Sequence, residues 1–286
     1  MVTMTDNDGR RIGDMTYEEK KQKLQKQMLV YAQGDMLVAF SGGVDSSLIL
    51  KLAVQAAAKT GHKVYGIMVH MMLHPMGEVE DARTTAEQIG AEFRVLEIDE
   101  LKGADILDNP VDRCYRCKKY LFRNLIEEGE KLGVSVMMEG TNEDDLHVYR
   151  PGLRAIRELG IHSPLAEAGM TKAEVRKLAG ELGISVSNKP SMPCLATRFP
   201  YGTRISYEAM RKVDEGEVFV RSLGFYNVRL RIHNDVARIE VDVNEMPRLL
   251  EHCEQIVAKL KNLGYDYITV DLEGFRSGSM DLHVKK

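Results

Sequence analysis

The stretch Phe40-Ser41-Gly42-Gly43-Val44-Asp45-Ser46-Ser47 decides the fold of this chain. The apolar run at 36–40 predicts a buried parallel strand, and residues 48–53 have the composition of a helix. Two adjacent glycines let the backbone approach a ligand closely. The N-terminus of the following helix offers unpaired N–H groups and a partial positive charge. The stretch therefore predicts an anion-binding loop at the carboxyl end of a strand.

Three serines and one aspartate complete this loop. The hydroxyls of Ser41, Ser46 and Ser47 add hydrogen-bond donors, and Asp45 places a carboxylate among the expected phosphates. A carboxylate suits that position when a Mg2+ ion lies between it and the phosphates. The loop contains no lysine, so it does not match the Walker pattern G-x-x-x-x-G-K-[ST].

The sequence Ser-Gly-Gly-Val-Asp-Ser-Ser resembles the pyrophosphate loop of the ATP pyrophosphatase superfamily. Members of that superfamily cleave ATP between its α and β phosphates and transfer AMP to a substrate oxygen. The resemblance implies that Asp45 binds Mg2+. It also implies that Met68, at the end of the next strand, lines the adenine pocket, and the alternative is that Met68 is a plain core residue. It implies ATP contacts from Ser41, Gly42, Gly43, Ser46 and Ser47. The alternative is a serine-capped helix start that binds no ligand.

The bulk composition limits the classes of protein to consider. At 286 residues the chain suits one large or two modest domains. A net charge of −4 and the lack of a long basic run argue against a dedicated nucleic-acid binder. No stretch approaches the ~18–20 apolar residues of a membrane span, and the polar N-terminus lacks the apolar core of a signal peptide. We therefore expect a cytoplasmic protein.

Alternating strands and helices indicate the fold class. Predicted strands occupy residues 36–40, 63–69, 93–98 and 134–138. Predicted helices occupy residues 17–31, 48–59, 78–89, 113–132 and 171–183. This order predicts an α/β fold with a doubly wound parallel sheet. Because ligands bind at the carboxyl ends of such strands, Gly140 and Thr141 should face the same crevice as the Ser-Gly-Gly loop.

The pattern changes after a proline-rich segment at 187–198. The elements predicted beyond it are a helix at 206–223, strands at 228–232 and 236–243, a helix at 244–263 and a strand at 267–272. This α-β-β-α-β order predicts a smaller C-terminal α+β domain. We expect a disordered lead-in at 1–15, an ATP pyrophosphatase domain at 16–190, and a substrate or oligomerisation domain at 191–286.

The cysteines indicate metal or redox chemistry. Cys114 and Cys117 form a C-x-x-C pair on one face of a predicted helix start. Such a pair fits zinc, a redox dithiol or part of an iron–sulfur site, but no fourth ligand with zinc-like spacing follows it. Three thiolates, with Cys194 as the third, suit a 4Fe-4S cluster with one open iron. Cys253 lies within an amphipathic helix and is predicted to be a buried core thiol.

Taken together, these stretches resemble the LarE family of ATP-dependent sulfur transferases, which help to build the nickel-pincer nucleotide cofactor. The resemblance covers nearly the whole chain after the first dozen residues. Beyond the loop it rests on the segments D-R-C-Y-R-C-K at 112–118, E-G-T-N at 139–142, Y-R-P-G at 149–152, P-S-M-P-C-L-A at 190–196, V-R-L-R at 228–231 and G-F-R-S-G-S at 274–279.

The resemblance implies a staged reaction. ATP adenylates a carboxylate of pyridinium-3,5-biscarboxylic acid mononucleotide, and a protein-bound sulfur then displaces AMP and leaves a thiocarboxylate. Two routes for the sulfur are implied. Either Cys194 gives up its own sulfur, or Cys114, Cys117 and Cys194 ligate a 4Fe-4S cluster whose open iron carries a sulfide. We expect the cluster route, because this chain has all three cysteines.

The second domain offers a candidate substrate site. Arg229 and Arg231 alternate onto one strand face, and a two-residue turn at Asn234-Asp235 would place Arg231 opposite Arg238. Two arginines across a strand pair repel each other unless an anion lies between them, and the substrate phosphate is the candidate. Further candidates are Arg198 and Glu217. The alternative is a solvated arginine face.

Three other functions compete with sulfur transfer to a small molecule. A tRNA thiolase would share the chemistry but should carry a basic RNA-binding surface. An ammonia-using amidotransferase of the NAD or GMP synthetase kind would not need three crevice cysteines, and a nucleotide-binding sensor would not turn ATP over. We expect a homo-oligomer whose partners are ATP and a pyridinium mononucleotide, with no nucleic acid and no membrane. The sequence does not identify the upstream sulfide donor.

Overall fold

The structure is a computed structural model that describes residues 15–71, 78–148, 150–185 and 194–276. The described residues fall into two compact units. The first contains residues 15–71, 78–104, 114–148 and 150–185, and the second contains residues 105–113 and 194–276. Most of the predicted lead-in and most of the predicted proline-rich segment lie outside the described residues.

A four-stranded parallel sheet forms the centre of the first unit, in the order β3-β2-β1-β4. Its strands are β1 (Met36–Ala39), β2 (Val64–His70), β3 (Glu92–Glu97) and β4 (Val136–Met138). Val38 of β1 pairs with Gly66 on one side and with Met138 on the other. The strand order therefore reverses between β1 and β4, which is where a doubly wound sheet binds its ligands.

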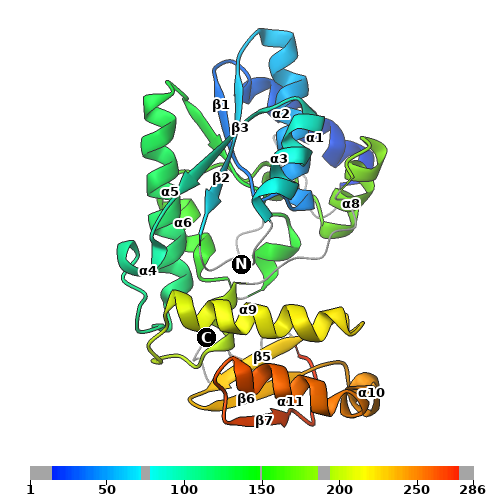
Figure 1. The fold of residues 1–286 in the computed structure, drawn as a ribbon. Coiled ribbons are helices and arrows are strands. Elements are labelled where there is room, and N and C mark those ends of the chain that lie inside the picture. The colour runs from blue at the N-terminus through cyan, green and yellow to red at the C-terminus, as the bar shows by residue number, and fades with distance from the viewer. Residues whose placement is uncertain (1–14, 72–77, 149, 186–193, 277–286) are drawn as a thin grey trace. The chain divides into compact units, whose positions relative to one another are not determined.

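Helices cover both faces of this sheet (Figure 1). The helices packed on one face are α1 (Tyr17–Tyr31), α2 (Val44–Thr60), α3 (Glu78–Ile89) and α8 (Lys172–Glu181). Those on the other face are α5 (Arg113–Lys131) and α6 (Gly152–Glu158). Strand β1 serves both cores, because Val38 packs in the α2 cluster while its neighbour Leu37 packs with Phe122 of α5. The predicted α/β class is confirmed.

The same unit contains three short helical segments that the sequence analysis did not predict. They are α4 (Glu100–Gly103), the 3-10 helix η2 (Asp144–His147) and α7 (Pro164–Glu167), each of four residues, and the seven-residue α6 (Gly152–Glu158) was not predicted either. Asp99 caps α4 by accepting a hydrogen bond from the backbone N–H of Lys102. A single turn carries too few residues to display helical periodicity, so pattern analysis treats it as loop.

A three-stranded sheet forms the second unit, in the order β5-β6-β7. Its elements are the 3-10 helix η3 (Leu195–Arg198), α9 (Tyr207–Ser222), β5 (Arg229–His233), β6 (Val236–Glu240) and β7 (Tyr267–Val270). Arg231 pairs with Arg238 across the β5–β6 hairpin, as predicted, and the turn residue Asn234 has a φ of 57°. Leu230 packs against α9 at Gly216, where an added Cβ would lie 2.7 Å from its Cδ2 atom.

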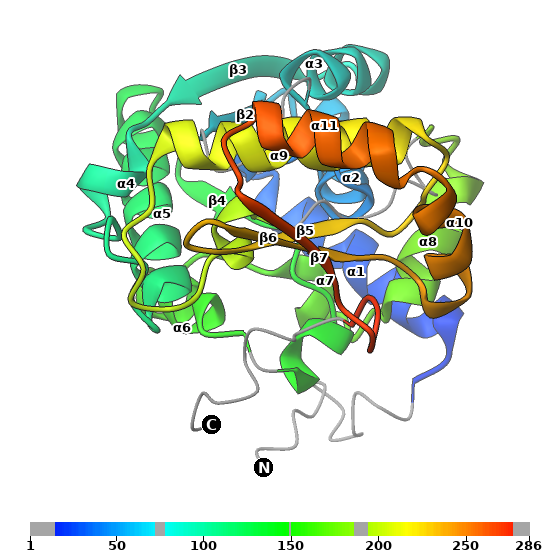
Figure 2. The same ribbon diagram turned by 60° about the horizontal axis from the view of Figure 1, so that its bottom comes forward.

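The predicted helix at 244–263 is wrong as a single element. The chain forms the 3-10 helix η4 (Val243–Glu245), α10 (Met246–Glu251) and α11 (Cys253–Asn262), and it leaves helical geometry at His252. Figure 2 shows α11 lying beside α9. Cys253 is the first residue of α11 and is exposed, whereas Ile256 and Leu260 further along the same helix are buried. The prediction that Cys253 is a buried core thiol is therefore wrong.

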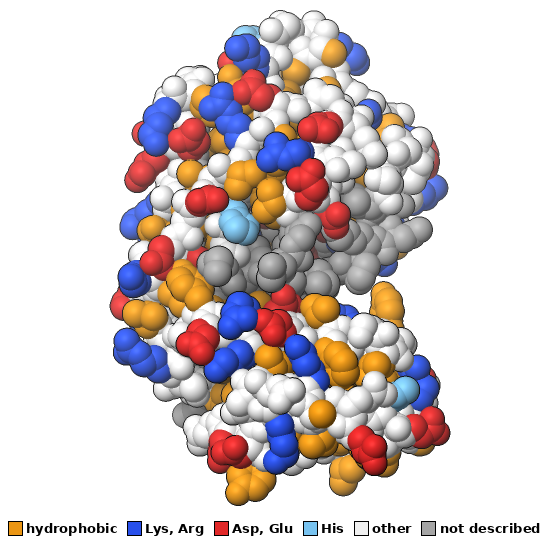
Figure 3. Space-filling view, in the orientation of Figure 1, with side chains coloured by type: hydrophobic (Ala, Val, Ile, Leu, Met, Phe, Trp, Pro, Cys, Tyr) orange, Lys and Arg blue, Asp and Glu red, His pale blue; other side chains and the backbone are white. Residues whose placement is uncertain are grey.

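No helix among the described residues is long and apolar enough to cross a membrane. On the face drawn in Figure 3, lysine and arginine side chains are interspersed with aspartate and glutamate. That face therefore does not present one continuous basic surface.

Candidate functional site

The Ser-Gly-Gly loop forms the turn between β1 and α2. Gly42 has a φ of +70°, which a side chain would disfavour, and an added Cβ would lie 3.1 Å from Ala82. The Ser46 hydroxyl accepts a hydrogen bond from the Ser41 backbone N–H (3.2 Å) and donates one to the Gly43 carbonyl (3.1 Å). Ser46 therefore holds the loop in shape. The Ser47 hydroxyl is buried and has no hydrogen-bond partner among the described residues.

The turn after β4 meets this loop, as the parallel order predicted. An added Cβ at Gly140 would lie 2.8 Å from the backbone nitrogen of Ser46, so only glycine fits there. Buried Glu139 holds the turn by accepting hydrogen bonds from the Thr141 N–H (3.0 Å) and hydroxyl (2.8 Å). Asn142 donates a hydrogen bond to Asp45 Oδ1 (3.2 Å). The loop carboxylate is thus oriented from the neighbouring strand end.

Lys172 completes the surroundings of Asp45. It is the first residue of α8, whose start is fixed by the capping box between Thr171 and Glu174. Its Nζ forms an ion pair with Asp45 Oδ2, and its backbone N–H donates to Asp144 Oδ2 (2.8 Å). The capping box was predicted from the sequence, whereas the ion pair between Lys172 and Asp45 was not. The lysine that the loop itself lacks is therefore supplied by a helix far along the chain.

The other residues predicted to contact ATP occupy contrasting environments. Met68 is 2% exposed and belongs to the core cluster on the α2 face. The adenine contact assigned to it stays a prediction. Thr141 is buried at the turn after β4, where its hydroxyl donates to Glu139. Its backbone carbonyl accepts a hydrogen bond from the N–H of Ala166 (3.1 Å).

The three cysteines predicted to ligate a cluster lie on two elements. Cys114 and Cys117 occupy the first turn of α5, where Cys114 is exposed and Cys117 packs partly against the second core cluster. Cys194 is half-buried and directly precedes η3. Among the described residues, no group of three His, Cys, Asp or Glu side chains is placed to hold a metal ion. The three-cysteine cluster therefore stays a prediction.

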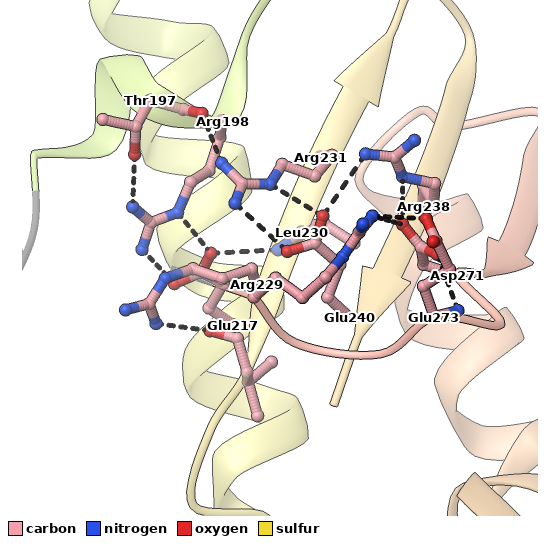
Figure 4. A network of polar contacts seen from close by, with 12 residues as sticks. Thr197, Arg198, Glu217, Arg229, Leu230, Arg231, Arg238, Glu240, Asp271 and Glu273 are labelled. Carbon is pink, nitrogen blue, oxygen red and sulfur yellow. Dashed lines mark hydrogen bonds and ion pairs between the residues drawn. The ribbon is translucent and has the colours of Figure 1, made fainter. Parts of the chain in front are cut away.

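Two buried ion pairs organise the arginines of the second unit (Figure 4). Arg198 donates to both carboxylate oxygens of Glu217 (2.7 and 2.9 Å), and each side chain is at most 2% exposed. Arg231 donates to both oxygens of Glu240 (3.0 and 3.1 Å). Burial alone would raise the pKa of Glu217, but the hydrogen bonds and charge of Arg198 outweigh burial and lower it.

The expected need for an external anion between Arg231 and Arg238 is not supported. Glu240 lies between them, because its Oε1 also accepts a hydrogen bond from Arg238 Nη2 (3.3 Å). An internal carboxylate therefore neutralises the cross-strand arginine pair. Strand register alone could not predict this, since Glu240 stands opposite Arg229 in the hairpin.

Arg229 differs from its neighbours. It is half-buried, donates to the Val228 carbonyl (2.7 Å) and lies 5.1 Å from the centre of the Phe275 ring. Among the described residues, no carboxylate forms an ion pair with it. Burial, followed by the positive charge of Arg198, lowers the pKa of Arg229 to about 10. A bound anion would relieve this unfavourable environment, so Arg229 is the best placed of the four candidates to contact a substrate phosphate.

Known proteins resemble the chain along most of its length. A family model described as a PP-loop domain matches residues 14–157. A pyridinium-3,5-bisthiocarboxylic acid mononucleotide synthase of Lactiplantibacillus plantarum is 37% identical over 259 residues, which cover 90% of this chain and 93% of that protein. An uncharacterized protein of Synechocystis sp. is 36% identical over 247 residues, with coverages of 86% and 91%. A tRNA-specific 2-thiouridylase of Rickettsia massiliae is 28% identical over 197 residues, with coverages of only 55% and 52%.

Proposed function

The chain belongs to the LarE family of PP-loop proteins, and from this we propose that it is an ATP-dependent sulfurtransferase acting on pyridinium-3,5-biscarboxylic acid mononucleotide. The observation that carries the proposal is the placement of Asp45 at the ends of β1 and β4, between Asn142 and Lys172. This arrangement suits the polyphosphate of ATP. One of the relatives that match most of the chain in both directions carries the name of the thiocarboxylate-forming synthase.

The loop fits ATP and a divalent ion on three grounds. Gly42 allows the left-handed turn of the loop and Gly140 allows the turn after β4 to pack directly against Ser46. The Ser47 hydroxyl is buried without a partner among the described residues, and Asp45 provides a hard oxygen ligand. In the proposed reaction Asp45 would hold Mg2+, whose charge would neutralise the phosphates, and Lys172 would bind the departing pyrophosphate. The substrate carboxylate displaces pyrophosphate from the α phosphorus and becomes an acyl adenylate. Adenylation is required because a carboxylate oxygen is otherwise a poor leaving group.

The arginines of the second unit are proposed to bind the substrate. Arg229 contacts the phosphate of the mononucleotide, while Glu217 and Glu240 fix Arg198 and Arg231 around it. We assign the ATP chemistry to a domain at 16–190 and substrate binding to a domain at 191–286. The second unit also includes residues 105–113, which the sequence placed with the ATP domain.

Sulfur is proposed to reach the acyl adenylate through Cys114, Cys117 and Cys194. Cys114 and Cys117 lie three residues apart on one helix face, a spacing that suits two ligands of one cluster. A 4Fe-4S cluster held by the three thiolates would supply a transferable sulfide at its open iron. A sulfur delivered there would attack the acyl carbon while the carbon–oxygen bond to AMP breaks, and AMP would leave with the bonding electrons. Replacing any one of Cys114, Cys117 and Cys194 by serine should then lower the iron content of the protein after anaerobic reconstitution. Cys253→Ser, at an exposed thiol, should bind as much iron as the wild type.

The activity is tested by measuring pyrophosphate release from ATP with different acceptors. Release should depend on the pyridinium mononucleotide and should not be stimulated by unmodified tRNA. Stimulation by tRNA alone would favour the thiolase function. Release that requires ammonia would favour an amidotransferase, and the absence of ATP turnover with every acceptor would favour a sensor.

A further inference from the structure

A buried polar contact joins two chain segments within the second unit. Asn109 is fully buried, and its Nδ2 donates to the carbonyls of Phe199 (3.0 Å) and Pro200 (2.8 Å). The backbone is paired as well, because the Gly202 N–H donates to the Asn109 carbonyl (3.0 Å). The side chain and the main chain of Asn109 therefore both hold the segment that follows η3.

Arg113 extends this contact toward α5. Its Nη1 donates to Asn109 Oδ1 (2.9 Å), and its guanidinium lies 4.6 Å from the centre of the Tyr201 ring. Arg113 is only 3% exposed. Asn109 thus uses both ends of its amide, with the donor on one segment and the acceptor on the other. We call Asn109, Arg113 and Tyr201 the clamp.

The backbone of Asn109 is in the left-handed region, with a φ of 47°. This conformation is unfavourable for a residue with a Cβ, and glycine adopts it more readily. Asparagine adopts this conformation more readily than most residues with a Cβ, and the side chain of Asn109 also binds two carbonyls and one guanidinium. The clamp is therefore a built connection between the two segments.

Each segment of the clamp lies near a candidate sulfur-handling cysteine in the sequence. Arg113 is joined by a peptide bond to Cys114. On the other segment, Phe199 follows η3, which begins after Cys194. The Cys194 carbonyl accepts hydrogen bonds from the Thr197 hydroxyl (2.8 Å) and from Arg198 Nη1 (3.2 Å), so the chain from Cys194 to the clamp is held at both ends.

We propose that the clamp is a positioning device that fixes the segment leading into Cys114, residues 109–113, against the segment that follows Cys194, residues 199–202. Its purpose, the delivery of one sulfur by both thiols, rests on the proposed function. Its geometry does not, because every contact described above lies among residues 105–113 and 194–205. Asn109 and Arg113 are positioning residues and do not touch the reacting atoms.

The test uses Asn109→Gly, which keeps the left-handed backbone accessible and removes the hydrogen bonds of the Asn109 side chain to Phe199, Pro200 and Arg113. The matched control is Asn234→Gly, the same change at an exposed asparagine with a φ of 57° in the β5–β6 turn. Both are made in full-length protein that carries Cys117→Ser and Cys253→Ser, so that Cys114 and Cys194 are the remaining thiols. Dibromobimane, which becomes fluorescent when it bridges two thiols, reports how well the pair is held together.

The parent and the control should form the fluorescent bridge at equal rates, and Asn109→Gly should form it about tenfold more slowly or worse, because reaction between held groups depends steeply on their placement. Pyrophosphate release by each variant, measured with Cys117 and Cys253 restored, should stay at the wild-type rate. A parent that does not bridge, or an Asn109→Gly variant that bridges as fast as the parent, would overturn the proposal.

If Asn109→Gly does not fold, Arg113→Lys is the second variant. It keeps the positive charge and the hydrogen bonds from Asn109 to the two carbonyls, and it should slow bridging to a smaller extent. If Asn109→Gly slows bridging as expected but the wild-type protein transfers no sulfur, the result would support the clamp and refute the proposed function.

Discussion

Lys172 of α8 forms an ion pair with Asp45 of the Ser-Gly-Gly loop, although 127 residues separate them in the sequence. The contact brings the positive charge of the Lys172 ammonium to a loop whose own sequence has none. In Walker loops a lysine within the motif has this position beside the phosphates. Here the same charge comes from the first residue of a capped helix. The pairing therefore predicts that Lys172 exchanges the Asp45 carboxylate for a phosphate when ATP binds.

Replacement of Lys172 by methionine should lower the rate of pyrophosphate release by about 10²-fold, because a positioned charge on the leaving group is lost. Stopped-flow detection of pyrophosphate measures this rate directly. Lys177→Met is the matched control, since Lys177 lies on the same helix and is exposed, with its ammonium over the Tyr17 ring. Equal rates for the two variants would remove Lys172 from the ATP site.

Replacement of Asp45 by asparagine should also reduce pyrophosphate release by about 10²-fold or more, because the proposed Mg2+ ligand loses its charge. A Mg2+ titration of the rate separates a weakened metal site from a damaged loop. Asp35→Asn tests the same change at the other end of β1, where Asp35 accepts a hydrogen bond from the Lys63 N–H (2.9 Å). Wild-type release by Asp45→Asn with an unchanged Mg2+ requirement would show that Asp45 does not hold the metal.

Arg229→Gln should weaken binding of the pyridinium mononucleotide by about 1.5–3 kcal/mol and leave ATP affinity unchanged, because it removes a charged contact to the substrate phosphate. Calorimetric titration with each ligand measures both affinities. Arg204→Gln serves as a control, since that arginine is 75% exposed and pairs with Asp108, an equally exposed carboxylate. Equal losses for ATP and for the mononucleotide would move Arg229 to the nucleotide site.

Glu217→Gln should destabilise the protein by about 3–5 kcal/mol at pH 7, because it leaves the buried Arg198 guanidinium without its carboxylate. The folded-state pKa of Glu217 is lowered, so its stabilisation is present above the usual carboxyl pKa and is lost as the pH falls through the lowered value. Chemical denaturation at several pH values should show the wild-type advantage shrinking toward acid. Glu215→Gln, on the same helix and 36% exposed, should have little effect at any pH. A constant difference across the pH range would contradict this account.

Local patterns in the sequence predicted the parts of the fold that depend on nearby residues. The capping box from Thr171 to Glu174 predicted the start of α8, and the turn at Asn234 predicted the pairing of Arg231 with Arg238. Both depend on chemistry within a few residues. The parallel sheet itself followed from the order of the elements along the chain.

The parts that were missed depend on contacts between distant segments. The ion pair between Lys172 and Asp45 could not be predicted from local sequence patterns. The same holds for the ion pairs of Glu240 with Arg231 and Arg238. The break at His252 was missed because the apolar spacing of Leu249, Ile256 and Leu260 fits one continuous helix. Tertiary packing decided these positions.

The central claim is tested most directly by mass spectrometry of both substrate and protein after one anaerobic reaction. The iron-reconstituted chain is mixed with ATP, Mg2+, sulfide and pyridinium-3,5-biscarboxylic acid mononucleotide. The account predicts that oxygen is replaced by sulfur in both carboxylates, that one AMP and one pyrophosphate form for each exchange, and that the mass of the protein chain does not change. A mononucleotide that keeps all its carboxylate oxygens would contradict sulfur transfer, and a chain lighter by the mass of one hydrogen sulfide molecule would contradict the cluster route.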